Sequence, residues 1–230
     1  MRASRREAIE RLLEPDALVE RLPEPAEIAI ALGIAIALLG IAGAVVGTDA
    51  YQGEGSIWDR MFSLVNEKTV PTFFSGAILF AGGLCAMVAA RVRLYGMHRL
   101  WIAFGALLIF MSADEVFQIH EHIETATGID WEQPYAVVAI GAAFVWFNVL
   151  RRMEPFPRWL MIAGAVGWAI SFVLEDAEYD SADHRVSGFT VMAIIEELGE
   201  MIGSSLWLLA IVIALKAHAR AAPEPAARYA

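Results

Sequence analysis

The stretch SADEVFQIHEHIE, residues 112–124, places carboxylates and imidazoles directly after the apolar run LWIAFGALLIFM, residues 100–111. Its ionisable members are Asp114, Glu115, His120, Glu121, His122 and Glu124. Carboxylates combined with imidazoles are ligands for zinc, iron or manganese. The same side chains also act as general acids and bases. The stretch is therefore a candidate for a metal site or for acid–base catalysis.

Helical spacing predicts which of these side chains face the same way. At about 100° per residue, a continuous helix places one polar set within an arc of roughly 120°. The members of that set are Asp114, Glu115, Gln118, Glu121 and His122. His120 falls on the other side of such a helix, and we expect it to replace His122 as a ligand only if the helix unwinds near its end.

Two further segments carry carboxylates at helical spacing. In AIIEELGEMIGSS, residues 193–205, three glutamates lie within an arc of about 100°, and they are Glu196, Glu197 and Glu200. The segment SFVLED, residues 171–176, ends another apolar run, which begins near residue 159, and it contains Glu175. We expect the helices that carry these residues to pack around one polar pocket with the helix of residues 112–124.

The composition predicts what positions these groups. The 230 residues are 58% hydrophobic and 19% charged, against about half and about a quarter in soluble proteins. The excess lies in six runs near the length of about 20 residues that crosses a bilayer. The runs cover about 27–47, 71–90, 99–120, 135–150, 159–175 and 190–215. Because backbone groups in lipid must bond internally, we predict an all-α polytopic bundle of six transmembrane helices.

The segments outside these runs define the predicted domain organisation. Residues 1–26 mix Arg and Glu with apolar residues at helical spacing, which predicts a cytoplasmic amphipathic segment on the membrane surface. Residues 27–215 form the transmembrane domain. Residues 216–230 are predicted to be a disordered cytoplasmic tail, because they are small and polar.

The basic residues predict the orientation. Of the 17 Lys and Arg, 14 lie on the side that carries both termini, and Lys and Arg accumulate in cytoplasmic loops. Both termini are therefore expected in the cytoplasm, and the loops at 48–70, 121–134 and 176–189 outside. In a bacterium this describes a multi-pass protein of the inner membrane with a periplasmic-facing site. The outer side carries 18 of the 27 acidic residues, so it attracts cations.

Carboxylates at one depth of a membrane need a compensating charge, because like charges within a few ångström oppose one another's ionisation. The compensating charge is either protons or a divalent metal ion, with zinc, iron or manganese as the candidates. The predicted metal ligands are Glu121, His122, Glu197 and Glu200, with Glu175 as a further ligand and His120 as the substitute named above. Asp114, Glu115 and Glu196 are the predicted catalytic carboxylates. A cysteine-based metal site is excluded, because Cys85 is the one cysteine.

Three functions are compatible with this pattern. The first is a membrane-embedded, metal-dependent enzyme, with hydrolysis as the simplest chemistry, that acts on a lipid or lipid-borne substrate. The second is a cation or proton transporter, which is disfavoured because SSLWLLAIVIAL offers few polar groups farther into the membrane. The third is an accessory or sensing subunit of a larger membrane complex. Membrane lipids are the expected partners, an oligomer is compatible with the sequence, and no nucleic-acid motif is present.

Overall fold

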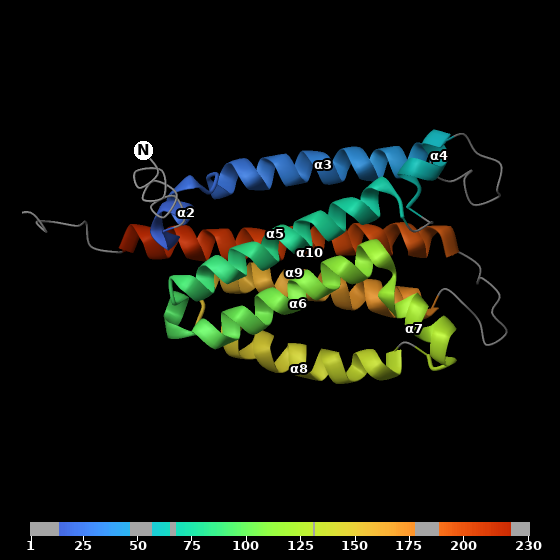
Figure 1. The fold of residues 1–230 in the computed structure, drawn as a ribbon. Coiled ribbons are helices and arrows are strands. Elements are labelled where there is room, and N and C mark those ends of the chain that lie inside the picture. Colours follow the sequence, from blue (N-terminus) through green and yellow to red (C-terminus); the bar gives the residue numbers. More distant parts are fainter. Residues whose placement is uncertain (1–13, 47–56, 65–67, 131, 178–188, 222–230) are drawn as a thin grey trace, which may run out of the picture.

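The computed structural model describes residues 14–46, 57–64, 68–130, 132–177 and 189–221 (Figure 1). The elements of these ranges are all helical. They are α2 (Pro15–Arg21), α3 (Pro25–Val46), α4 (Ile57–Phe62), α5 (Val70–Arg91), the 3-10 turn η2 (Leu94–Gly96), α6 (His98–Phe117), α7 (Ile119–Thr127), α8 (Glu132–Leu150), α9 (Pro155–Ala177) and α10 (Phe189–Ala221). The predicted all-α class is confirmed for this part of the chain.

Six of the described helices are long and apolar enough to cross a membrane. They are α3, α5, α6, α8, α9 and α10, and they follow the six predicted runs in order. The chain is thus a multi-pass helical membrane protein. α10 continues to Ala221, beyond the predicted end at residue 215. Residues 1–13 of the predicted N-terminal segment and 222–230 of the predicted tail lie outside the described residues.

α10 is the central helix of the bundle. It packs against α9, α5 and α3, and 61% of its spanning window is buried, compared with 6% for α3. Aromatic rings join it to its neighbours: Trp207 lies edge-on to Phe104 of α6 and stacked on Trp168 of α9, with ring centroids 6.2 Å apart in each pair. Figure 1 shows α10 running the length of the molecule, with α3 on one side, α6, α8 and α9 on the other, and α5 crossing it. α8 packs mainly on α6 and is the outermost helix on that side.

Glycines let the helices of two pairs approach closely. A Cβ added at Gly167 or Gly203 would lie 2.8 Å from the Gly199 carbonyl oxygen and 2.9 Å from the Gly164 carbonyl oxygen, respectively. The α9 and α10 backbones are therefore nearly in contact, as in other membrane helix pairs built on small residues. α5 and α6 meet in the same way at Gly83, where an added Cβ would be 3.0 Å from a carbonyl oxygen of α6.

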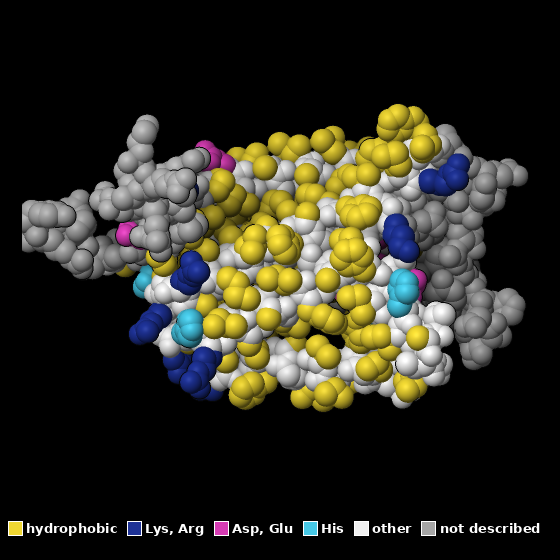
Figure 2. Space-filling view, viewed as in Figure 1, with side chains coloured by type: hydrophobic (Ala, Val, Ile, Leu, Met, Phe, Trp, Pro, Cys, Tyr) yellow, Lys and Arg dark blue, Asp and Glu magenta, His cyan; other side chains and the backbone are white. Residues whose placement is uncertain are grey.

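The two ends of the bundle differ in charge. Lys216 of α10 lies 3.4 Å from the Glu24 carboxylate, and Arg220 lies 2.8 Å from it, so α10 ends beside the start of α3. This α2 end also carries the connections between α5 and α6 and between α8 and α9, where exposed arginines gather (Figure 2). The opposite end carries α4 and α7 and is called the α7 end below (Figure 1). That the α7 end faces outward stays a prediction.

Candidate functional site

The predicted continuous helix through residues 112–124 is wrong, because the backbone turns at Gln118. This residue is buried and left-handed, with φ 50° and ψ 52°, and it separates α6 from α7 (Figure 1). A left-handed residue other than glycine is strained, so the surroundings must stabilise it. The Asp114 carboxylate does so by accepting the His120 backbone N–H at 3.0 Å, a donor that the interrupted helix leaves unpaired.

The turn brings Asp114, His120 and Tyr135 together at the α7 end. His120 Nδ1 lies 3.2 Å from Asp114 Oδ2, and the Tyr135 hydroxyl donates to Asp114 Oδ1 at 2.7 Å. The two rings also meet edge to face, with centroids 6.4 Å apart. These three residues, called the Asp114 network below, connect α6, α7 and α8. A carboxylate bound to one imidazole nitrogen fixes the ring orientation, which is the arrangement that acid–base histidines use.

A second set of carboxylates lies on the other side of α6. Glu200 feels the charges of four more glutamates, which come from α6, α9 and α10. They are Glu115, Glu175, Glu196 and Glu197, and the five residues are called the glutamate group below. All five side chains are partly buried. Asp114 and Glu115 are adjacent in sequence but about 100° apart around the helix, so α6 supplies one carboxylate to each set.

Hydrogen bonds from α5 and α9 hold the α10 part of the glutamate group. The Thr72 hydroxyl of α5 donates to Glu197 Oε1 at 3.3 Å. The Ser171 hydroxyl of α9 donates to the Glu196 carbonyl oxygen at 2.8 Å. Both bonds depend on close helix packing, and an added Cβ at Gly199 would lie 2.5 Å from Ser171 Oγ. The backbone positions of these glutamates are therefore fixed by neighbouring helices rather than by α10 alone.

α5 forms a polar wall beside the glutamate group. An added Cβ at Gly76 would lie 3.7 Å from the Glu115 Cβ, which places Glu115 against this wall. Ser75 is fully buried, and among the described residues its hydroxyl has no hydrogen-bond partner. Because Thr72 meets Glu197 and Gly82 meets Leu208, Ser75 lies at the depth of Glu200. Ser204, one turn beyond Glu200 on α10, is also buried, and its hydroxyl has no hydrogen-bond partner in the described part of the chain.

Three of the predicted metal ligands lie outside the glutamate group, and one of them, His120, belongs to the Asp114 network. Glu121 and His122 are exposed on α7, and His122 Nδ1 lies 2.7 Å from the Gln118 carbonyl oxygen of its own turn. The physical reason is the left-handed Gln118, which rotates α7 away from the arc that a straight helix would give. Within the described ranges, no three His, Cys, Asp or Glu side chains are arranged to hold a metal ion. The predicted four-ligand arrangement is therefore not formed in this geometry, and the metal itself stays a prediction.

The sequence analysis missed Tyr135, Thr72 and the glycines that close α9 onto α10. Gly199 and Gly203 form a Gly-x-x-x-Gly pair, which is a recognisable sign of close packing between membrane helices. Tyr135 follows Asp114 by 21 residues in a different helix, and no local pattern connects them. Thr72 likewise lies 125 residues before Glu197.

Comparison with known proteins gives one curated relative. It is the 4-hydroxybenzoate octaprenyltransferase of Chromohalobacter salexigens, 24% identical over 136 residues. The match covers 57% of this chain and 39% of that protein, so the chain matches well under half of the relative's length. No solved structure matches.

A family model matches residues 29–214, a range that begins in α3 and ends in α10 and includes the glutamate group and the Asp114 network. The model describes a domain of unknown function, DUF8692. Because it covers most of the sequence, the chain belongs to the DUF8692 family.

Proposed function

We propose that this protein is a membrane-embedded enzyme that acts on a lipid or lipid-borne substrate through the glutamate group. The observation that carries the proposal is that Glu200 is partly buried in a membrane-spanning helix and that the charges of four other carboxylates, from three helices, act on it. Such groupings are costly in a membrane and are retained where they serve a function. The buried and unpartnered hydroxyls of Ser75 and Ser204 provide further hydrogen-bonding groups at this depth.

The proposed chemistry is general acid–base catalysis. Carboxylates that act on one another's charge favour sharing protons, and the proposed site uses this: one member donates a proton while another accepts one. Such a pair can donate a proton to a leaving group and accept one from an attacking group. The charges of Glu115 and Glu196 act on Glu200, and Thr72 donates a hydrogen bond to Glu197. Asp114, predicted to belong to the same site, belongs to the separate Asp114 network.

A divalent ion is the alternative source of compensating charge. Glu197 and Glu200 of α10 and Glu175 of α9 would be its carboxylate ligands, after side-chain rotation brings their oxygens together. Zinc, iron or manganese would polarise a substrate oxygen or activate water. The described geometry favours the proton-sharing account, since no three ligands converge on one point. Elemental analysis of the purified protein distinguishes the two.

The relative supports a lipid-borne substrate. Its name describes the handling of an octaprenyl group and of 4-hydroxybenzoate. We infer that the present protein also acts on a molecule with a long hydrocarbon chain. Two reaction classes are therefore proposed. One is hydrolysis, the reaction expected from the sequence, and the other is transfer of such a chain to an acceptor. The proposed setting is the bacterial inner membrane, with the α7 end in the periplasm.

The test is lipid turnover by the reconstituted protein. Vesicles made from a total bacterial lipid extract would be incubated with the wild type, with Glu200→Gln and with Glu124→Gln. The last is the matched control, because Glu124 is exposed on α7 at the same end. We expect mass spectrometry to show a lipid species consumed by the wild type and Glu124→Gln but not by Glu200→Gln. An unchanged lipid profile, or an active Glu200→Gln, contradicts the proposal.

A further inference from the structure

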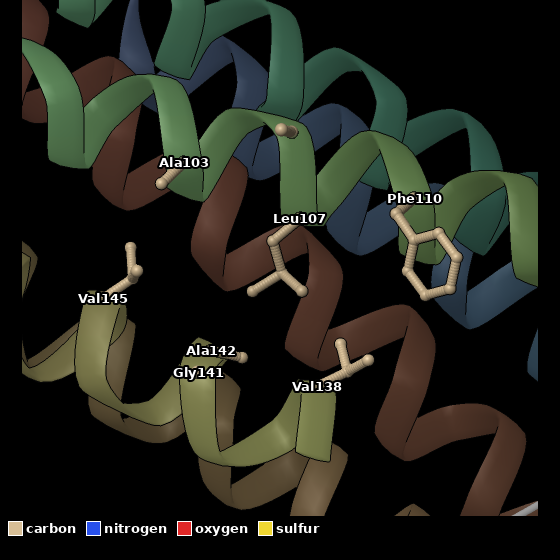
Figure 3. Close-up of a pocket in the computed structure, with 8 residues that line it drawn as sticks. Ala103, Leu107, Phe110, Val138, Gly141, Ala142 and Val145 are labelled. Carbon is tan, nitrogen blue, oxygen red and sulfur yellow. The ribbon is translucent and has the colours of Figure 1, made fainter. Parts of the chain in front are cut away.

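A cavity of about 290 Å³ lies between α6 and α8. The residues that line it carry no polar side chain: Ala103, Ala106, Leu107, Phe110, Val138, Gly141, Ala142 and Val145. In Figure 3, Leu107 and Phe110 of α6 point toward Val138 and Ala142 of α8 across the open space. Ligand pockets typically measure about 300–1,000 Å³, so this cavity is at the lower end of that range.

The cavity lies within the membrane-spanning parts of both helices. From Ala103 to Phe110 the α6 wall extends about 10 Å along the helix axis, at about 1.5 Å per residue. The faces of α6 and α8 that point away from the cavity have different surroundings. Ile140 of α8 is 74% exposed and faces the surrounding lipid, whereas Phe104 of α6 is buried against Trp207 of α10. The cavity is therefore a hollow at the protein–lipid boundary, where a hydrocarbon chain fits and water is disfavoured.

One wall residue of the cavity contacts the Asp114 network. Phe110 lines the cavity and also contacts the Tyr135 ring, with centroids 5.9 Å apart. Tyr135 in turn donates its hydroxyl proton to Asp114, which contacts His120. The apolar cavity is thus separated by the Phe110 ring from a carboxylate, an imidazole and a phenol at the α7 end. An amphiphile has two matching parts. Its hydrocarbon chain suits the apolar cavity, and its polar head suits the Asp114 network.

We propose that the cavity binds one hydrocarbon chain of an amphiphilic lipid, with the polar head of that lipid against the Asp114 network. The proposal rests on the proposed function for its lipid-borne substrate, and it assigns the place where that substrate's chain lies. The glutamate group and the Asp114 network flank the same end of α6. Asp114 and Glu115 are adjacent in α6, so a head group against the Asp114 network would lie at the same level of α6 as Glu115 of the glutamate group.

The test is saturable photolabelling in vesicles. One probe is a phosphatidylglycerol with a diazirine on its acyl chain, and the other is geranylgeraniol with the same group. We expect one of them to label the Ala103–Phe110 and Val138–Val145 peptides saturably, and unlabelled lipid of the same kind to compete. Which of the two probes does so shows whether the cavity binds an acyl chain or an isoprenoid chain. Contact with bulk lipid gives labelling that rises linearly with probe concentration. If both probes behave in this way, the proposal is overturned.

Substitution of glycine provides matched variants. Gly141 lines the cavity, and an added Cβ there meets no atom within 4 Å, so Gly141→Leu adds bulk at the cavity without displacing its neighbours. Gly33 on α3 is equally open and lies away from the cavity, so Gly33→Leu is its control. We expect Gly141→Leu to abolish saturable labelling and Gly33→Leu to retain it. If Gly141→Leu does not fold, Ala142→Leu fills the same space. Retained labelling in the folded cavity variant refutes the site.

Two more variants separate this site from the proposed function and test the head-group contact. Glu200→Gln removes the proposed acid–base residue but leaves the cavity, so we expect its labelling to match the wild type even though turnover is lost. Tyr135→Phe removes one hydrogen bond of the Asp114 network, and the half-saturating probe concentration should rise by about 2- to 10-fold. An unchanged value for Tyr135→Phe overturns the placement of the head.

Discussion

His120 contacts the Asp114 carboxylate twice, through its backbone N–H at 3.0 Å and through its imidazole Nδ1 at 3.2 Å. The two residues stand on opposite sides of the left-handed Gln118, so these contacts join the end of α6 to the start of α7. Tyr135 adds a hydroxyl donor from α8 to the same carboxylate. One aspartate therefore fixes the direction of α7 and ties α8 to the bundle.

Asp114→Ala should destabilise the protein by about 1–3 kcal/mol, because it leaves the His120 N–H and the Tyr135 hydroxyl without this acceptor. Thermal unfolding in detergent measures the loss. Asp130→Ala is the control, because Asp130 is exposed just beyond α7, and it should change stability by less than about 0.5 kcal/mol. Equal effects of the two substitutions would show that the Asp114 network does not stabilise the turn.

Gly203→Ala should destabilise the protein by about 1–3 kcal/mol through overpacking. The added Cβ would lie 2.7 Å from Trp168 Cδ1 and 2.9 Å from the Gly164 carbonyl oxygen, so α9 and α10 must move apart. Gly33→Ala meets nothing within 4 Å and serves as the control. We expect Gly33→Ala to be neutral or slightly stabilising, because alanine has the higher helix propensity. A stable Gly203→Ala would mean that this contact is loose.

The number and order of the spanning helices were predictable because each is an apolar run whose length is set by the bilayer. The arrangement of the site was only partly predictable. The charges of Glu115 and Glu175 act on Glu200, which is compatible with the predicted helical arcs, but the common site itself stays a prediction. Arc reasoning holds only while a helix is regular, so it placed Glu121 wrongly once Gln118 interrupted α6.

The interruption itself could not be read from the sequence. Gln118 is neither glycine nor asparagine, the usual residues at a left-handed position, and its neighbours Phe117 and Ile119 continue an apolar helical pattern. The turn depends on Asp114 accepting bonds from His120 and Tyr135, the second of which comes from another helix. A local sequence pattern does not reveal long-range contacts of this kind. These contacts decide which of the predicted ligands can come together.

Glu121→Gln should leave stability and lipid turnover unchanged, within about 0.5 kcal/mol, because Glu121 is exposed on α7. The straight-helix model predicts the opposite, since it counts Glu121 among the metal ligands. Thermal unfolding and the vesicle turnover assay measure both properties. A loss of turnover comparable with that of Glu200→Gln would return Glu121 to the site and would require α7 to move.

The orientation is testable with single cysteines in a Cys85→Ala background. Asp130→Cys lies at the α7 end and Arg152→Cys at the α2 end, and both native residues are exposed. With Lys and Arg concentrated at the α2 end, we expect an impermeant thiol reagent to label position 130 on intact cells and position 152 only after permeabilisation. The reverse pattern would place the α7 end, with the glutamate group, in the cytoplasm.

Glu200→Gln should raise the melting temperature if the glutamate group shares protons, because the substitution removes one carboxylate from a set of like charges inside the membrane. A chelator should then leave the wild type unaffected, and elemental analysis should find no stoichiometric metal. Glu124→Gln is the control for a generic loss of one acidic residue. A bound divalent ion predicts the opposite on every count, because metal binding stabilises the folded state. In that case Glu200→Gln melts at a lower temperature, chelation lowers the wild type toward the variant, and the glutamate group is a metal centre rather than an acid–base site.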